Sequence, residues 1–238
     1  MIYIDIGNTT FKAVKRTNVD WVDLFSTGIE NLEEIQSWIS SIHSDENMIA
    51  ASVRKDMNAL LDELGEKVRW IKNSDLSNFE MNYDTPKTLG MDRFLGCLGA
   101  STKTQNDVIV IDAGSACTID MMTKAQVYLG GVIMPGLELY HRTVETHLPE
   151  LPNVDRFLPN QFPGHSTKES LQWGINGAFV GSVDYFLRRF VTVESQPDIF
   201  VTGGDAETLK SFLQDSYDLK TRKYLVFDGM EEMQRFLD

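Results

Sequence analysis

Cysteine is scarce in this sequence, which has 238 residues but only Cys97 and Cys117. A pair of cysteines cannot build a disulfide framework or a cysteine-rich zinc site. Both lie in apolar stretches, so we expect them to be small buried side chains. The histidines are few as well, and their positions do not show the spacing of a metal site.

Positive charge and long apolar runs are also in short supply. Lys and Arg total 22 against 35 Asp and Glu, a formal net charge of −13. This balance argues against broad binding to nucleic acid or to anionic membranes, because both need a basic surface. No apolar run reaches the roughly 18 residues that span a bilayer, and no signal-peptide pattern is visible. We therefore expect a cytoplasmic protein that binds neither nucleic acids nor membranes.

Hydrophobic patterning predicts two halves built on one plan. In the first half we expect strands over residues 1–6, 10–15, 21–27, 48–53 and 68–71, with helices over 32–42 and 59–64. A loop over 73–88 leads to a helix over 91–102. In the second half we expect strands over 108–111, 116–122, 126–133, 199–202 and 224–227, with helices over 136–146, 168–190, 210–213 and 231–237. The proline-bearing stretch 148–164 is expected to be an extended loop.

A short motif recurs in the two halves. The segment Asp5-Ile6-Gly7-Asn8-Thr9 aligns with Asp112-Ala113-Gly114-Ser115-Ala116, and each follows an apolar strand. One copy would be weak evidence, because Asp and Gly are common turn residues. Two copies at equivalent places predict a duplicated α/β fold, with domains over 1–106 and 107–238 and a cleft between them.

The repeated turn suits a phosphate group. Gly7 and Gly114 lack a Cβ, which permits positive φ and lets a phosphate approach the backbone N–H groups. Asp5 and Asp112 offer hard oxygen ligands for the cation that accompanies phosphates. Lys12, on the next strand, could reach a β- or γ-phosphate. The alternative is a hairpin turn capped by an aspartate, with Lys12 a solvated strand residue.

A second constellation, Gly90-Met91-Asp92-Arg93, lies where a loop turns into a helix. A carboxylate there sits at the positive end of the helix dipole and stays ionised at neutral pH. Asp92 could accept a proton from an incoming hydroxyl, and Arg93 offers a fork that matches a carboxylate. The alternative is an acid that merely stabilises the helix start beside a surface arginine.

A third motif, Gly203-Gly204-Asp205, follows an apolar strand and precedes a helix. A double glycine there would let the backbone approach a nucleoside. A plain strand-to-helix turn is the alternative.

Taken together, the motifs resemble those of the type III pantothenate kinases over nearly the whole chain. The matching segments are Asp5 to Lys12, Gly90 to Arg93, Asp112 to Thr118 and Gly130 to Gly136, with support from Tyr83, Ser166-Thr167 and Thr202 to Gly204. The family usually has threonine where this chain has Ser115, which keeps the hydroxyl. Cys117 is another departure, and we expect it to face the core.

The resemblance implies duplicated ribonuclease H-like domains of the actin-like ATPase type around a nucleotide cleft. It implies phosphorylation of pantothenate by ATP with Mg²⁺ and a monovalent cation, K⁺ or NH₄⁺, in a homodimer. Asp92 would be the general base, Asp112 would bind the monovalent cation, and Asp5 would bind Mg²⁺ directly or through water. The ATP-binding residues would be Asp5, Ile6, Gly7, Asn8, Thr9, Thr10, Phe11, Lys12 and Ser115, and the pantothenate-binding residues Tyr83, Gly90, Met91, Asp92, Arg93 and Thr167.

Two other functions stay open at this stage. One is a phosphotransferase or phosphohydrolase of the same superfamily that acts on a sugar, acetate or polyphosphate. The other is a non-catalytic regulator that binds a nucleotide. The presence of Asp5, Asp92 and Asp112 together argues against a regulator, because a scaffold has no need for them.

Overall fold

The computed structural model describes residues 1–43, 46–57, 67–191 and 196–237. The helix predicted over residues 59–64 lies outside them. The chain forms two compact units. The first comprises Met1–Lys103, Gln126–Tyr128 and Tyr224–Asp238, and the second comprises Thr104–Ala125 and Leu129–Lys223. The C-terminal segment therefore packs with the first unit, although the sequence division at residue 106 assigns it to the second.

The first unit contains a five-stranded sheet in the order β3-β2-β1-β4-β5. Strand β1 is antiparallel to β2 and parallel to β4. The strands are β1 (Ile2–Ile6), β2 (Thr10–Arg16), β3 (Trp21–Gly28), β4 (Met48–Ser52) and β5 (Val68–Trp70). The helices are α1 (Leu32–Ser41), α3 (Met91–Ser101) and α7 (Leu225–Met233), with short 3₁₀ turns η1 (Lys55–Met57), η3 (Asn73–Asn78), η4 (Pro86–Thr88) and η5 (Gln234–Phe236).

Strand β1 separates two layers because its side chains alternate between the faces of the sheet. Ile2, Ile4 and Ile6 pack into a buried cluster that includes residues of α1. Tyr3 lies on the opposite face, where its ring meets Trp21 edge-on at 4.9 Å and its hydroxyl lies 3.4 Å from Oε1 of Gln234. Asp5 shares the face of Tyr3, so alternation directs this acid away from the isoleucine layer.

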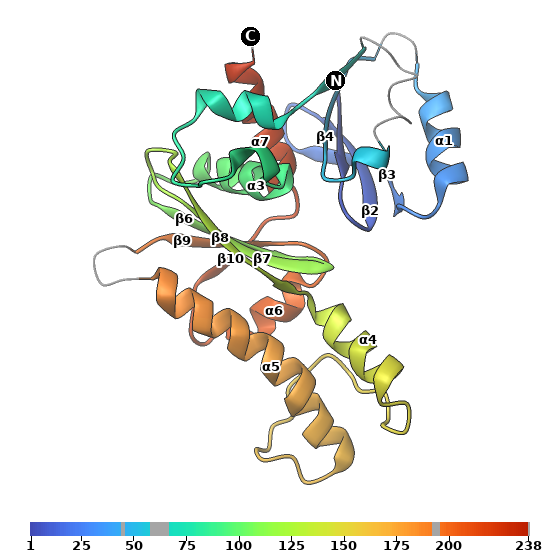
Figure 1. Ribbon diagram of the computed structural model, residues 1–238, viewed down its shortest axis with the longest axis vertical. Helices are drawn as coiled ribbons and strands as arrows, with labels where there is room; N and C mark the ends of the chain where they lie inside the picture. The colour runs from blue at the N-terminus through green and yellow to red at the C-terminus, as the bar shows by residue number, and fades with distance from the viewer. Residues whose placement is uncertain (44–45, 58–66, 192–195, 238) are drawn as a thin grey trace. The chain divides into compact units, whose positions relative to one another are not determined.

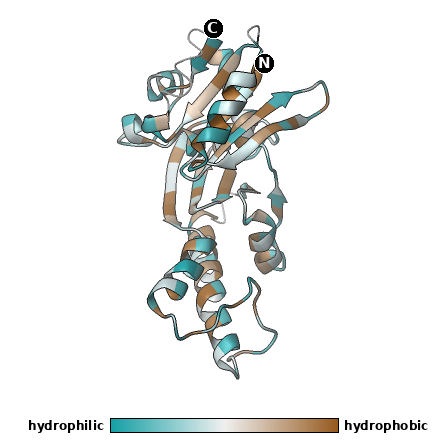
Figure 2. Cartoon of the chain, turned by 90° about the vertical axis from the view of Figure 1, so that its right-hand side faces the viewer, coloured by the Kyte–Doolittle hydropathy of each residue, from teal (hydrophilic) through white to brown (hydrophobic). Residues whose placement is uncertain are grey.

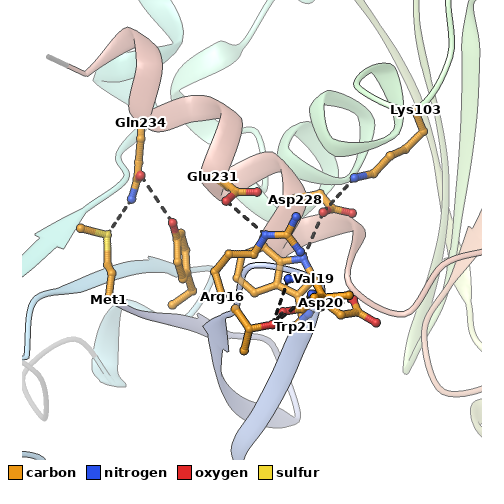
Figure 3. Close-up of polar contacts among 11 residues, drawn as sticks. Met1, Arg16, Val19, Asp20, Trp21, Lys103, Asp228, Glu231 and Gln234 are labelled. Atoms are coloured by element: carbon orange, nitrogen blue, oxygen red, sulfur yellow. Dashed lines mark hydrogen bonds and ion pairs between the residues drawn. The ribbon is translucent and has the colours of Figure 1, made fainter.

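Helix α7 is held against the rest of the first unit by its nearly buried residue Asp228. Asp228 is 9% exposed, and its Oδ1 lies 3.0 Å from both Nε1 of Trp21 and Nζ of Lys103 (Figure 3). Arg16 reaches Glu231 of the same helix at 3.3 Å. These contacts join α7 to β2, β3 and the end of α3 (Figure 3).

The strand predicted over residues 224–227 is wrong. This run belongs to α7, and the last strand is β10 (Leu219–Thr221). A short apolar run cannot be assigned to a strand or to a buried helix by periodicity alone. Here the helix is covered by α3: a Cβ on Gly229 would strike the backbone of Leu95, and one on Gly99 would strike that of Leu225.

The second unit repeats the plan. Its sheet has the order β10-β9-β6-β7-β8, and β6 is antiparallel to β7 and parallel to β9, as β1 is to β2 and β4. The predicted α/β duplication is thereby confirmed. The strands are β6 (Val108–Ala113), β7 (Ala116–Met122), β8 (Tyr128–Pro135) and β9 (Asp198–Thr202), and the helices are α4 (Leu137–His147), α5 (Thr167–Phe190) and α6 (Ala206–Leu213), labelled in Figure 1.

The core of the second unit lies against one face of its sheet. Ile109 and Ile111 of β6 pack with Phe179 and Val183 of α5 and with Leu209 of α6. The helices mix hydrophilic and hydrophobic residues along their length (Figure 2), as expected when one side of a helix is buried. Among the described residues, no helix is both long enough and apolar enough to span a bilayer.

Candidate active site

The first turn lies at the carboxyl end of β1. The backbone N–H of Gly7 donates to the carbonyl of Thr10 at 2.9 Å and closes the turn between β1 and β2. Asp5 of β1 is directly opposite Lys12 of β2 in the antiparallel register. Directly opposed residues point to the same face of a sheet, so this carboxylate and this ammonium share one face beside the turn. Lys12 is exposed and Asp5 is half-buried.

The second turn has the same construction. Asp112 of β6 is opposite Thr118 of β7 and Thr202 of β9, and the three side chains therefore form a polar row across one face of the sheet. Ser115 is half-buried in the turn. Asp112 occupies in this sheet the register position that Asp5 occupies in the first. The alignment of the two motifs in the sequence is thus reproduced in the folded chain.

Gly7 and Gly114 serve the turns by leaving space and not by an unusual backbone conformation. The glycines with positive φ in the described part of the chain are Gly130 and Gly203, so Gly7 and Gly114 do not use the positive φ that a missing Cβ permits. A Cβ on Gly7 would come no closer than 3.4 Å to the carbonyl oxygen of Thr10. The absence of a side chain at this turn therefore leaves space beside the backbone, and no unusual backbone conformation requires it.

Two further glycines pack against the second turn. Gly203 has a φ of 93°, and a Cβ there would lie 2.5 Å from Oδ1 of Asp112. Gly136 donates its N–H to the carbonyl of Ser115 at 3.0 Å, and a Cβ there would lie 2.7 Å from that oxygen. The segments leading into α4 and α6 are therefore brought to the Asp112 turn, which places the Gly203-Gly204-Asp205 motif beside it.

Cys117 lies directly behind this turn and faces the core, as expected. It is fully buried, and neither cysteine forms a disulfide. Burial raises the pKa of the Cys117 thiol to about 12, with further contributions from the carboxylates of Asp112, Asp205 and Asp120. The thiol is therefore neutral near pH 7.

The second constellation forms the N-terminus of α3. Gly90 is the residue before the helix, and Oδ1 of Asp92 accepts the backbone N–H of Arg93 at 2.8 Å. The carboxylate is half-buried at the end of the helix where the dipole favours negative charge. A Cβ on Gly90 would lie 2.6 Å from this oxygen. Arg93 is 9% exposed and makes interactions of its own.

Tyr83 is attached to α3 through another tyrosine. Its ring lies 5.7 Å from the ring of Tyr128, which is fully buried and lies 5.9 Å from the ring of Phe94 in α3. The backbone N–H of Asn82 donates to the carbonyl of Tyr128 at 2.8 Å. The structure thus connects Tyr83 to the helix that begins with Asp92 and Arg93.

Asn73 holds the loop that leads into α3, and sequence reasoning missed it. Its side-chain Nδ2 donates to the carbonyls of Pro86 and Leu89, both at 2.8 Å. Satisfying two loop carbonyls with one amide fixes the backbone just before Gly90. No pattern in the sequence marks this asparagine, because its partners are 13 and 16 residues away.

Thr167 is the first residue of α5, in the second unit. Ser166 caps the helix by accepting the N–H of Glu169 at 3.2 Å, and Glu169 in turn accepts the N–H of His165 at 2.8 Å. Thr167 is exposed and lines an open surface hollow of about 690 Å³. The lining residues are Leu151, Gly164, His165, Ser166, Thr167, Ser170 and Leu171.

The acidic residues of the two turns suit a cation that binds together with a nucleotide. Within the ranges that the structure describes, no three His, Cys, Asp or Glu side chains gather into a metal site. Mg²⁺ bound with a nucleotide needs one or two protein carboxylates, because phosphate oxygens and water complete its shell. Asp5, half-buried beside the first turn, suits that requirement, and Asp112 with the hydroxyls of Thr118 and Thr202 offers oxygen ligands beside the second.

Comparison with known proteins identifies relatives of this chain. The model of the type III pantothenate kinase family matches residues 1–189. A type III pantothenate kinase of Flavobacterium johnsoniae is 30% identical over 91% of this chain and 90% of its own length. Another, of Thermosipho africanus, is 26% identical over 92% of this chain and 94% of its own.

Solved structures share the fold. A Campylobacter jejuni chain that carries the name Baf family transcriptional activator superposes with a TM-score of 0.69 and 21% identity, covering 99% of this chain and 98% of its own. An inorganic polyphosphate/ATP-glucomannokinase of Arthrobacter superposes with a TM-score of 0.51 and 14% identity, with the same coverage. These likenesses show the expected fold of two ribonuclease H-like halves, as in actin-like ATPases.

Proposed function

Because this chain belongs to the type III pantothenate kinase family, we propose that it transfers the γ-phosphate of ATP to the primary hydroxyl of pantothenate. The product would be 4′-phosphopantothenate, in the first step of coenzyme A biosynthesis. The observation that carries the proposal is the family match over residues 1–189, which includes both turns and the start of α3.

We infer that the two turns bind the phosphates of ATP. The residues are Asp5, Ile6, Gly7, Asn8, Thr9, Thr10, Phe11 and Lys12 in the first turn and Ser115 in the second. The open space beside Gly7 and the ammonium of Lys12 support this role. Asp5 would hold Mg²⁺ directly or through water, and Asp112 would hold K⁺ or NH₄⁺. When bound, Mg²⁺ withdraws charge from the phosphate oxygens.

The acceptor would be held and activated at α3. Asp92 takes the proton of the pantothenate hydroxyl as that oxygen attacks the γ-phosphorus in line with the departing ADP. The helix N-terminus favours the negative charge of this carboxylate, and the hydrogen bond from the N–H of Arg93 orients it. Arg93 would bind the pantothenate carboxylate through two parallel hydrogen bonds, and Tyr83, Gly90, Met91 and Thr167 are the other residues that we assign to pantothenate. Most of the rate gain then comes from positioning and charge.

We further propose that the enzyme is a cytoplasmic homodimer. Several large apolar side chains are exposed in the chain by itself, among them Ile133 at 63% and Phe162 at 76%. Light scattering after gel filtration measures the mass in solution, and a monomer over the working concentration range would contradict this part of the proposal.

An ADP-release assay tests the reaction directly. The purified chain is supplied with MgATP and pantothenate, with K⁺ present or replaced by a bulky organic cation, and the product is identified by its mass. We expect pantothenate-dependent ADP release that rises with K⁺. Parallel reactions with a hexose and with acetate address the other kinase functions. ADP release that ignores pantothenate, or that follows another acceptor, would overturn the proposal.

A further inference from the structure

Arg156 connects two acids that come from different elements of the second unit. It lies in the segment between α4 and α5. Its Nη1 donates to Oδ1 of Asp205 at 2.8 Å, and its Nη2 donates to Oε2 of Glu138. Asp205 directly precedes α6, and Glu138 lies in the first turn of α4. One guanidinium thus holds the starts of two helices.

Both of these helix starts rest on the second turn. The backbone N–H of Asp205 donates to the carbonyl of Ala113 at 2.9 Å. Gly136, which immediately precedes α4, donates to the carbonyl of Ser115 at 3.0 Å. Arg156 therefore lies across the two segments that flank the turn of Asp112 and Ser115.

A buried amide places Arg156. Asn176 of α5 is fully buried, and its Nδ2 donates to the carbonyls of Asp155 at 3.0 Å and Phe157 at 2.9 Å, one on each side of Arg156. The remaining oxygen, Oδ1, lies 3.0 Å from Nε2 of His141. Because Oδ1 can only accept, His141 must donate from Nε2. All hydrogen-bonding groups of the amide are used, which fixes one backbone conformation around Arg156.

Arg156 offsets negative charge beside the second turn. Asp205 donates its backbone N–H to the carbonyl of Ala113, the residue after Asp112, so these two acids flank the same turn. Such negative charge favours a cation and repels the phosphates of a nucleotide. Asp205 is only 13% exposed in its side chain, so its charge is not fully screened by water, and Arg156 offsets it.

We propose that Arg156 is a positioning residue that neutralises Asp205 beside the second turn and thereby sets the balance between ATP binding and monovalent-cation binding there. This inference rests on the proposed function, because it takes the second turn as the place of both ligands. It goes beyond that function by naming a residue outside the phosphate turns that tunes them.

The variant Arg156→Gln should move the two affinities in opposite directions. We expect the KM for ATP to rise about two- to fivefold and the half-activating K⁺ concentration to fall by a similar factor, while the KM for pantothenate stays unchanged. A residue that merely supports the fold would raise both concentrations together. Arg156→Lys keeps the positive charge and should restore most of the difference.

Arg142→Gln is the matched control. Arg142 also pairs with Glu138, at 2.8 Å, but this ion pair lies within one helix and the Arg142 side chain is 68% exposed. We expect the KM for ATP and the half-activating K⁺ concentration of Arg142→Gln to match those of the wild type. The double variant Arg156→Gln/Asp205→Asn removes the uncompensated acid with the arginine, so its KM for ATP should return toward the wild-type value.

The outcomes separate the inference from the proposed function. A wild-type enzyme without pantothenate-dependent ADP release contradicts the proposed function. If the wild type is active, an Arg156→Gln enzyme with unchanged ATP affinity, or with ATP and K⁺ requirements that rise together, overturns only the inference. If circular dichroism shows that Arg156→Gln does not fold, the variant Asp205→Asn tests the inference instead. It removes the negative charge and keeps Arg156, so the half-activating K⁺ concentration should rise and the KM for ATP should not. If the wild type does not depend on K⁺, calorimetric titration with a non-hydrolysable ATP analogue compares the ATP affinity of Arg156→Gln with that of the wild type. The inference predicts weaker binding by the variant, and equal affinities overturn it.

Discussion

The carboxylate of Asp92 occupies the space that a side chain at Gly90 would need. A Cβ built on Gly90 would lie 2.6 Å from Oδ1 of Asp92, the oxygen that accepts the N–H of Arg93. The glycine is thus required by the position of the acid and not by its own backbone, whose φ of −62° any residue can adopt. The orientation of the acid at the start of α3 depends on the residue before the helix.

Gly90→Ala should therefore damage catalysis more than folding. The added methyl group displaces the Asp92 carboxylate, and a shift of about 1 Å in a catalytic group costs roughly a hundredfold in rate. We expect kcat to fall about ten- to a hundredfold, with circular dichroism unchanged. Gly181→Ala in α5 is the control, because a Cβ there meets nothing within 4 Å. Equal kcat values for the two variants would contradict the account of Gly90.

Lys12→Ala tests the first turn. Lys12 lies opposite Asp5 and is expected to contact a phosphate of ATP. Its loss should raise the KM for ATP about ten- to a hundredfold, because a hydrogen bond to a charged group contributes roughly 1.5–3 kcal/mol. Lys15→Ala is the matched control on the same strand, because Lys15 is engaged with Glu46 at 2.7 Å. The two KM values are measured at saturating pantothenate, and no difference between them would exclude Lys12 from the nucleotide site.

Arg93→Lys tests the recognition of the acceptor. Lysine keeps the charge but cannot bind a carboxylate through two parallel hydrogen bonds. We expect the KM for pantothenate to rise about tenfold while the KM for ATP changes little. Initial rates at varied pantothenate measure this, and an unchanged KM for pantothenate would remove Arg93 from the pocket.

Gly99→Ala tests the packing of α7 on α3. A Cβ on Gly99 would strike the backbone carbonyl of Leu225, and a backbone atom cannot swing aside as the end of a flexible side chain can. Overpacking of this kind costs about 1–3 kcal/mol. We expect a lower midpoint of urea unfolding, with Gly181→Ala again as the control. A midpoint equal to that of the wild type would show that the two helices lie farther apart.

Much of this fold follows from patterns that lie close together in the chain. Apolar strands that end in Asp-x-Gly predicted the duplication, and the matching registers of Asp5 and Asp112 confirm it. The strand predicted over 224–227 was wrong because this run is buried by α3, which lies more than 120 residues earlier in the chain. An apolar run carries no sign of whether a sheet or a helix covers it.

The motifs of the candidate site can be recognised in the sequence, but the residues that support the neighbouring loops cannot. Asp5, Asp92 and Asp112 stand in motifs whose spacing suggests phosphate chemistry. Asn73 and Asn176 stand in no motif, yet each fixes a loop beside the site through backbone carbonyls. Such supports depend on tertiary contacts, so the sequence offers no local signal for them.

Turnover of Asp92→Asn tests the central claim most directly, because asparagine has nearly the same shape but cannot accept the proton of the attacking hydroxyl. The measurement is kcat for pantothenate-dependent ADP release, with Asp215→Asn, a change at an exposed acid, as the control. We predict a loss of about 10²- to 10⁴-fold for Asp92→Asn and none for the control. A folded Asp92→Asn enzyme with wild-type turnover would contradict the account and leave Asp92 as an acid that only stabilises the start of α3.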